Sequence, residues 1–283
     1  MKLLRFGEFG REKPGIELAT GQRKDLSAHF ADWNRDFFQS NGLAALRKLL
    51  DSGKNLPDVA PGLRHGSCVA RPGKIVAIGL NYRDHAAESN LAVPQEPVIF
   101  FKAPNTTVGP YDDILIPRNS TKTDWEIELG VIIARDVRYL ASQTQAADHI
   151  AGYCISHDVS EREFQLEHGG QWVKGKSCDT FNPLGPVLVT PDDIEDIANL
   201  DMHLAVNGET RQKGNTRNMV FGPHYLVYYL SQFMTLEAGD LITTGTPAGV
   251  GLGFDPPQFL QQGDVVSLTI DHLGSQRQQC RNA

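Results

Sequence analysis

Cysteine is scarce in this sequence, and the few cysteines are scattered. They are Cys68, Cys154, Cys178 and Cys280, and no two of them form a C-x-x-C pair. Disulfide frameworks and zinc sites both need cysteines at close and regular spacing. We therefore expect neither in this chain.

Long apolar runs are missing as well. A membrane-spanning helix needs about 20 consecutive apolar residues, and no stretch of the sequence approaches that length. The first seven residues carry positive charge but lack the apolar segment of a secretory signal. We therefore expect a cytoplasmic protein without a membrane partner.

The chain has no excess of positive charge. Lys and Arg total 27 against 34 Asp and Glu, which gives a net charge of −7. This balance excludes nucleic acid as the main partner, because a phosphate backbone is bound by clustered cations. A small anionic ligand stays compatible with it, because local groups and a bound metal outweigh net charge at a site.

Several common catalytic motifs are absent from the sequence. It contains no G-x-S-x-G, no H-E-x-x-H, no Walker motif and no internal repeat. The glycines at 249, 251 and 253 do not form a nucleotide loop, because no helical pattern opens after them. Chemistry that depends on these motifs is not expected.

What is present is a pattern of many short strands and few helices. We predict strands over residues 2–6, 15–18, 74–79, 97–102, 124–134 and 152–157, and a hairpin over 201–212 that turns at Asn207-Gly208. Two Gly-Asp turns, at 239–240 and 263–264, each open a further apolar strand. We predict helices from Ser27 through Trp33 and over residues 43–50, 81–88, 142–150 and 221–233, with one more starting at a capping box over 160–163. The fold class is α+β, mainly β.

A proline- and glycine-rich stretch without periodicity divides the chain. It runs from residue 52 to residue 73 and is the best candidate for a linker. We predict a small amino-terminal α+β domain with its linker over residues 1–70, and a larger domain over residues 71–283.

Two glutamates on one predicted core strand are the most informative feature. Side chains alternate along a strand, so Glu126 and Glu128 point to the same face while Trp125, Ile127 and Leu129 point to the other. Adjacent buried carboxylates repel each other and lose hydration, so they require a cation or a donor network between them. The alternative is a surface strand with a solvated acidic face.

Asp158 completes a set of oxygen ligands. It follows the predicted strand 152–157, at the start of the next helix, where anionic groups are favoured. Its simpler role would be to cap that helix. Together, Glu126, Glu128 and Asp158 suit Mg²⁺, with Mn²⁺ or Ca²⁺ as alternatives, and leave coordination positions open for substrate or water.

A histidine and a glutamate on another predicted helix form a candidate general base. His85 and Glu88 stand three residues apart, so they share a helix face and can hydrogen-bond. A carboxylate that orients a histidine is a common arrangement for water activation. An exposed polar pair is the alternative reading of that spacing. Arg162, Gln165 and Lys176 are surface residues by default.

At these residues the chain resembles the fumarylacetoacetate hydrolase family. The resemblance covers residue 74 to the end and rests on six motifs in order, at 79–88, 124–130, 158–165, 176–186, 206–212 and 239–249. The amino-terminal unit is similar to that of bacterial members that act on diketo-deoxy sugar acids.

The resemblance implies a mixed β-sandwich roll, a homodimer, and a 2-oxo acid substrate that chelates a metal. It assigns the metal to Glu126, Glu128 and Asp158, and the catalytic groups to His85, Glu88 and Lys176. It places Arg162, Gln165 and Thr246 against the substrate carboxylate or pyruvate moiety. One departure is His157, where relatives commonly have Asn, which leaves the surroundings of the metal ligand Asp158 in question.

The leading hypothesis is hydrolysis of a carbon–carbon bond in a 2,4-dioxo acid of the acylpyruvate type. His85, oriented by Glu88, would activate water for attack at the 4-keto carbon, while the metal and Lys176 stabilise the departing pyruvate. By resemblance, the substrate is a 2,4-dioxo-3-deoxy sugar acid such as 2,4-didehydro-3-deoxy-L-rhamnonate.

Four alternatives stay open. The same site could decarboxylate an oxaloacetate-type acid, isomerise a 2-hydroxyhepta-2,4-diene-1,7-dioate-type acid, or cleave ureidoglycolate. A non-catalytic binder of dicarboxylates is a fourth reading, which the His85–Glu88 pair and Lys176 oppose.

Overall fold

The computed structural model describes residues 1–88, 90 and 92–283. Its longer strands are β1 (Lys2–Phe6), β2 (Lys13–Glu17), β4 (Ile75–Gly79), β5 (Val98–Lys102), β9 (Ile127–Ile133), β10 (Ile150–His157), β12 (Asn182–Val189), β13 (Asp201–Val206), β14 (Glu209–Asn215), β16 (Val265–Ile270) and β17 (Gly274–Asn282). The shorter strands are β3 (Arg23–Asp25), β6 (Thr107–Val108), β7 (Ile114–Ile116), β8 (Thr123–Asp124), β11 (Ser160–Glu161) and β15 (Leu241–Thr243).

Helices are short and few. The α-helices are α1 (Arg35–Gln39), α2 (Gly42–Asp51), α3 (Arg83–Glu88), α4 (Arg162–Leu166), α5 (Val173–Lys176) and α6 (Pro223–Ser231). Single turns of 3₁₀-helix lie at Pro104–Thr106, Pro191–Asp193, Thr216–Asn218 and Gly251–Gly253, and a longer one spans Gln143–His149. No helix within the described residues is long and apolar enough to cross a membrane. The predicted class, α+β and mainly β, is confirmed.

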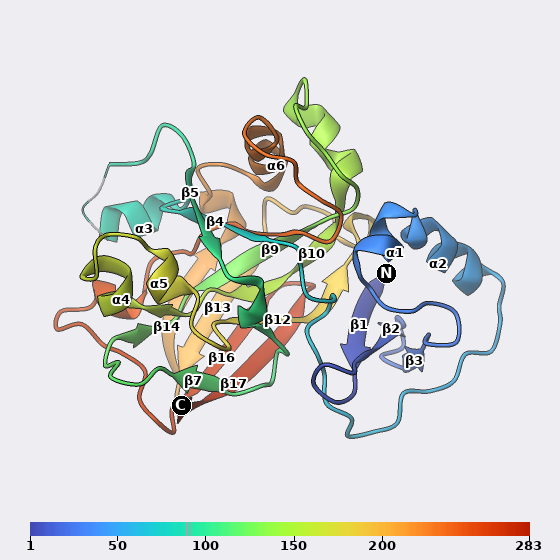
Figure 1. The fold of residues 1–283 in the computed structure, drawn as a ribbon, viewed down its shortest axis with the longest axis horizontal. Helices are drawn as coiled ribbons and strands as arrows, with labels where there is room; N and C mark the ends of the chain where they lie inside the picture. The colour runs from blue at the N-terminus through green and yellow to red at the C-terminus, as the bar shows by residue number, and fades with distance from the viewer. Residues whose placement is uncertain (89, 91) are drawn as a thin grey trace.

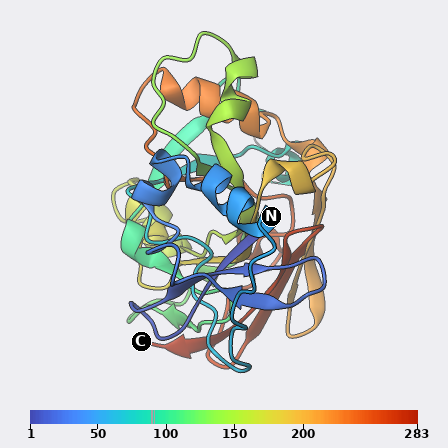
Figure 2. The same cartoon turned by 90° about the vertical axis from the view of Figure 1, so that its right-hand side faces the viewer.

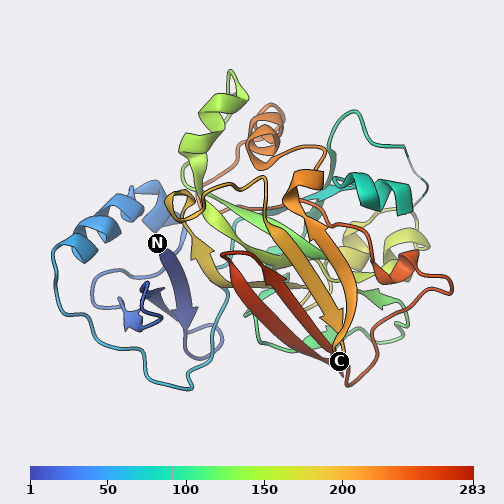
Figure 3. The ribbon, with the colours of Figure 1, turned by 180° about the vertical axis from the view of Figure 1, so that it is seen from behind.

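Two sheets form the body of the molecule (Figure 1). The larger has ten strands, in the order β3-β2-β1-β12-β10-β9-β15-β4-β5 with β6 beside β12, and the smaller has the order β14-β13-β16-β17-β7. Figure 3, from behind, shows the smaller sheet in front of the larger. The hairpin predicted at Asn207-Gly208 is confirmed, because β13 and β14 pair on either side of it.

Alternation along β9 separates a core face from a polar face. Ile127, Leu129, Val131 and Ile133 lie in the core that also contains Leu204 of β13 and Leu268 of β16, and this core fills the space between the sheets. Glu128 points to the opposite face of the larger sheet. The two carboxylates predicted to share a face are therefore on the outer side of the sheet and still buried.

The amino-terminal strands continue the larger sheet. β1 pairs antiparallel with β12 as well as with β2. Helices α1 and α2 lie beside these strands (Figure 1), and Phe37, Phe38 and Leu46 pack in a second core with Ile132 and Leu241. Figure 2 shows this amino-terminal unit toward the viewer. The division at residue 70 stays a prediction.

Two predicted helices differ from the structure. The helix from Ser27 through Trp33 is wrong: residues 27–29 form a turn, and α1 begins at Arg35 with Asn34 as its N-cap. The indole of Trp33 is drawn inward instead, where it donates to the carbonyls of Leu4 and Gly15 at 2.8 and 3.1 Å. Residues 143–149 form a 3₁₀-helix and not an α-helix.

The strand predicted over 124–134 is divided in two. Asp124 belongs to β8, which pairs with β11, and β9 starts at Ile127. Glu126 therefore lies in the short connection between them. The capping residue of α4 is Glu161, whose side chain accepts from the backbone N–H of Glu163 at 3.2 Å, and not the predicted Ser160.

Candidate active site

Three carboxylates, on β9 or directly beside the ends of β9 and β10, meet on the outer face of the larger sheet. Ser156 of β10 stands opposite Glu128 of β9 in the antiparallel register, which brings the following Asp158 near Glu126. One oxygen of each of Glu126, Glu128 and Asp158 lies within 4.8 Å of the others, and all three side chains are buried. The set predicted from sequence comes together in space, and its role as metal ligands stays a prediction.

Two lysines compensate part of this negative charge. Lys176, at the end of α5, donates to Glu126 Oε2 and Asp158 Oδ2, both at 2.8 Å. Lys102, at the end of β5, donates to Asp158 Oδ1 and to the carbonyl of Val159. Burial opposes ionisation of Glu126, but Lys176 and Arg162 outweigh it and hold the pKa of this carboxyl well below its ordinary value.

Glu128 has no such compensation. It accepts hydrogen bonds from the hydroxyl of Thr243 and, at 2.8 Å, from the N–H of Gly245. Within the described residues, no Lys or Arg forms an ion pair with it. Burial, with the charges of Asp158 and Glu126, raises the pKa of Glu128 well above its ordinary value.

The donor set fits a hard divalent cation. Four buried carboxylates, those of Asp124, Glu126, Glu128 and Asp158, face three buried cations, Lys102, Lys176 and Arg162. The excess negative charge lies at Glu128, the one of these four carboxylates without a cationic partner among the described residues, and Glu128 is next to the other two candidate ligands. Oxygen donors of this kind are those that Mg²⁺, Mn²⁺ and Ca²⁺ prefer, and a bound cation would permit Glu128 to ionise.

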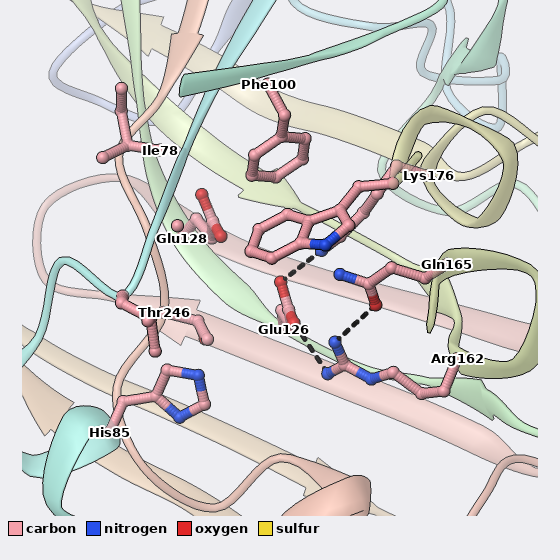
Figure 4. A pocket seen from close by; sticks show the side chains of 12 residues that line it. Ile78, His85, Phe100, Glu126, Glu128, Arg162, Gln165, Lys176 and Thr246 are labelled. Atoms are coloured by element: carbon pink, nitrogen blue, oxygen red, sulfur yellow. Dashed lines mark hydrogen bonds and ion pairs between the residues drawn. The ribbon is translucent and has the colours of Figure 1, made fainter. Parts of the chain in front are cut away.

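Arg162 links the carboxylate cluster, through Asp124, to the 3₁₀ turn at Gly251–Gly253. Its Nε donates to Asp124 Oδ2 at 2.8 Å. Its Nη2 donates to Glu126 Oε1 at 2.7 Å and its Nη1 to Gln165 Oε1 at 3.1 Å (Figure 4). Asp124 in turn accepts from the N–H groups of Gly251 and Leu252. Arg162 is buried and not a surface residue, and its guanidinium is a fixed clamp between two carboxylates.

The predicted contact between His85 and Glu88, the candidate general base and the residue that orients it, forms on α3. His85 Nδ1 lies 3.2 Å from Glu88 Oε2, and Glu88 Oε1 accepts from the N–H of Gly249 at 2.9 Å. The carboxylate is therefore held by both the ring and the backbone. His85 lies across the pocket from Gln165 and Lys176, with Glu126 between them (Figure 4).

A small cavity of about 60 Å³ joins these groups. Its lining contains seven of the nine residues predicted from the sequence, with Ile78, Gly79, Leu80, Phe100 and Trp172 as further walls. The two predicted residues outside this lining are Glu88 and Asp158, which contact lining residues. The nine residues predicted from the sequence therefore lie around a single small cavity or contact its lining.

Thr246 lines the small cavity, and two hydrogen bonds fix its hydroxyl. Its hydroxyl donates to the carbonyl of Ile127 at 2.8 Å and accepts from Gln212 Nε2 at 2.8 Å. The hydroxyl proton is therefore already donated to the carbonyl of Ile127. Its assignment as a substrate contact stays a prediction that requires the hydroxyl to rotate.

Sequence reasoning missed Lys102 and Asp124 as parts of the site. Lys102 ends an apolar strand on the same face as Phe100, and both are buried. A lysine in phase with a buried aromatic on a strand was the available signal. For Asp124 the sequence held no comparable signal, because its partners come from residues 162, 251 and 252.

His157 does not enter the site. It faces the space between the sheets, where its Nδ1 lies 3.1 Å from Gln278 Oε1. Burial lowers its pKa to about 3, so the ring is neutral. The departure noted at this position therefore changes the packing behind Asp158 and leaves the carboxylate cluster intact.

Comparisons with known proteins agree with this geometry. A family sequence model described as "Fumarylacetoacetate (FAA) hydrolase C-terminal" matches residues 74–281. A protein of Burkholderia ambifaria named "putative hydrolase" is 53% identical over 284 residues, with 100% of both chains covered.

Two solved structures have the same fold. One, a "probable 2-hydroxyhepta-2,4-diene-1,7-dioate isomerase" from Mycobacterium abscessus, matches with a TM-score of 0.81 at 31% identity, covering 100% of this chain and 99% of that chain. The other is maleylpyruvate hydrolase from Sphingobium sp. SYK-6 in complex with a manganese(II) ion and pyruvate. It matches with a TM-score of 0.81 at 27% identity, and both chains are covered completely.

Proposed function

The chain belongs to the fumarylacetoacetate hydrolase family, and from that premise we propose that it is a metal-dependent hydrolase that cleaves a carbon–carbon bond in 2,4-dioxo acids and releases pyruvate. One observation carries the proposal: Glu126 and Glu128 of the buried Glu126–Glu128–Asp158 cluster line the same small cavity as a histidine that is held by a glutamate. The neighbour that binds manganese and pyruvate supports both the metal class and the product. Mg²⁺ is the ion we propose, with Mn²⁺ or Ca²⁺ as alternatives.

The metal would be held by Glu126, Glu128 and Asp158. Bound there, a divalent cation would supply Lewis-acid stabilisation of negative charge on the 2-oxo acid end of the substrate. The other steps, which are activation of water and binding of the 2-oxo acid end, are assigned to side chains that line the small cavity.

Water activation is assigned to His85. Its Nδ1 is engaged with Glu88, so Nε2 is the nitrogen free to take a proton. Glu88 is fixed by the Gly249 N–H, which orients the ring, and it stabilises the cationic ring after proton transfer. The hydroxide produced attacks the 4-keto carbon, and the bond between carbons 3 and 4 breaks with its electron pair passing to carbon 3. The acyl fragment leaves as a carboxylic acid, and the pyruvate enolate takes the proton back from His85 at carbon 3, which gives pyruvate and restores the base.

The opposite wall orients the 2-oxo acid end. Gln165 accepts from Arg162 through Oε1, which leaves its amide N–H groups free to donate to the substrate carboxylate. Lys176 stabilises the negative charge that develops on the departing pyruvate. Phe100 and Trp172 exclude water from this wall.

A pyruvate-release assay with a panel of acylpyruvates and Mg²⁺ or Mn²⁺ tests the proposal. We expect turnover that stops in excess chelator. His85→Ala should lose about 10²–10⁴-fold in kcat, the range of general-base catalysis, and still bind metal and pyruvate. His168→Ala is the matched control, because His168 is exposed and does not line the small cavity. Wild-type turnover by His85→Ala would refute the assignment of the base.

Isomerisation is the second candidate, because one neighbour is described as an isomerase. In that case His85 would move a proton between carbons, and the substrate would change its ultraviolet absorbance without releasing pyruvate. Decarboxylation of oxaloacetate would release carbon dioxide together with pyruvate, and cleavage of ureidoglycolate would release glyoxylate and urea, each in an assay supplied with that substrate. A binder of dicarboxylates would release no product from any of these substrates. We further propose a 2,4-dioxo-3-deoxy sugar acid as substrate and a homodimer as the assembly.

A further inference from the structure

A second cavity adjoins the first and is the natural place for the rest of the substrate. It has a volume of about 360 Å³ and is lined by His85, Glu88, Arg162, Val250, Leu252 and Gly253. His85 and Arg162 also line the smaller cavity of about 60 Å³. A ligand whose 2-oxo acid end occupies the small cavity therefore extends past His85 into the larger one.

The described wall of the second cavity contains one carboxylate and no cation that lacks a carboxylate partner. Glu88 is its carboxylate, and Val250, Leu252 and Gly253 contribute no charge. Of the described residues that line it, Arg162 is the single Lys or Arg. Its Nε and Nη2 are committed to Asp124 and Glu126, so its charge is already balanced by two buried carboxylates.

Arg83 and Arg211, on nearby elements, do not line the second cavity, and each has contacts outside it. Arg83 Nη1 donates to the carbonyl of Met219 at 2.8 Å. Arg211 Nη2 donates to Glu209 at 3.0 Å, and its guanidinium lies over the rings of Trp125 and Phe254. The described residues 90 and 92–97, which follow α3 in the chain, include no Lys or Arg, and the one charged residue among them is Glu96.

We infer that the second cavity accepts an uncharged acyl group and rejects a terminal carboxylate. The inference rests on the proposed function and narrows its substrate class to 2,4-dioxo acids whose acyl end is neutral. A carboxylate placed there would lose hydration beside Glu88, and among the described residues that line the cavity no Lys or Arg is free of a carboxylate partner. Leu252, 39% exposed on the cavity wall, is the position where a cation would reverse this preference.

Binding of two uncleavable acids tests the inference without any need for turnover. 2-Oxoheptanoate and 2-oxoheptanedioate share the 2-oxo acid end, and only the second carries a distal carboxylate. In titration calorimetry with Mg²⁺ we expect the diacid to bind roughly tenfold or more weakly, because unpaired like charges oppose binding. Equal or tighter binding of the diacid would overturn the inference.

Turnover of the matching substrates separates this inference from the proposed function. If 2,4-dioxoheptanedioate is cleaved with a higher kcat/KM than 2,4-dioxoheptanoate, the inference is wrong and the hydrolase proposal stands. If neither is cleaved but the neutral acid binds more tightly, the inference stands and the hydrolytic proposal fails.

Two variants at one position provide the matched control. Leu252→Lys adds a cation to the wall and should raise diacid binding relative to neutral-acid binding by roughly tenfold. Leu252→Met keeps the wall neutral and should retain the wild-type preference. The same preference in Leu252→Lys as in Leu252→Met would contradict the charge argument.

Discussion

Removing the buried ammonium of Lys102 should destabilise the fold and, at the same time, make it more dependent on metal. Lys102 is buried at the end of β5, and Nζ donates to Asp158 Oδ1 and to the carbonyl of Val159. Lys102→Met keeps most of the side-chain length and removes the charge. Among the described residues, Asp158 then retains Lys176 as its one cationic partner, at 2.8 Å.

The expected loss follows from the cost of leaving a buried charge with less compensation. Breaking a buried ion pair costs about 3–5 kcal/mol. Because Lys176 stays in contact with Asp158, we expect the lower end, about 3 kcal/mol in chelator. Bound Mg²⁺ would replace the missing positive charge, so the difference from wild type should shrink in excess Mg²⁺.

Urea unfolding followed by tryptophan fluorescence, in chelator and in excess Mg²⁺, measures both effects. Lys122→Met is the control, because Lys122 pairs with Glu167 at the surface, where ion pairs contribute little. The reasoning would be refuted if Lys102→Met were as stable as Lys122→Met in chelator. A loss that Mg²⁺ leaves unchanged would show that Lys102 does not share a charge balance with the metal site.

Three further predictions concern the metal, pH and packing. Glu128→Ala should abolish the rise in Tm with added Mg²⁺, whereas Glu209→Ala, at an exposed carboxylate, should keep it; an unchanged rise in Glu128→Ala would remove Glu128 from the ligand set. Burial and then Arg23 lower the pKa of His65 to about 4. The unfolded chain therefore binds a proton that the folded chain does not between about pH 6.5 and pH 4. The free energy of unfolding should decrease as the pH is lowered through that window, by up to about 1.4 kcal/mol per pH unit. This dependence on pH should be weaker in His65→Gln, and equal dependence of the two proteins in urea titrations would contradict the prediction. Trp33→Phe should cost roughly 1–3 kcal/mol, because the carbonyls of Leu4 and Gly15 lose their indole donor, and an unchanged urea midpoint would count against it.

Local patterns predicted the elements that carry the candidate ligands. Alternation in residues 125–131 placed Glu126 and Glu128 together and opposite the apolar core, and the structure agrees. The spacing of His85 and Glu88 likewise predicted their contact on one helix face. These features depend on the period of a strand or a helix, which neighbouring residues determine.

Local patterns failed where a distant partner decided the outcome. The segment after Ser27 has helical spacing, but the indole of Trp33 reaches two strand carbonyls and the chain turns instead. Residues 124–126 have strand composition, but β8 leaves the main ladder to pair with β11. In both cases hydrogen bonds to distant residues outweighed local preference.

By itself, the sequence determined which residues can do chemistry here and which face of each element they occupy. Only the tertiary structure decided how their charges are balanced: that Lys102 and Lys176 share Asp158, that Arg162 joins Asp124 to Glu126, and that Glu128 has no cation. The physical reason is that electrostatic interaction depends on distance and burial across the whole fold, and these partners lie 18 to 56 residues apart in the chain.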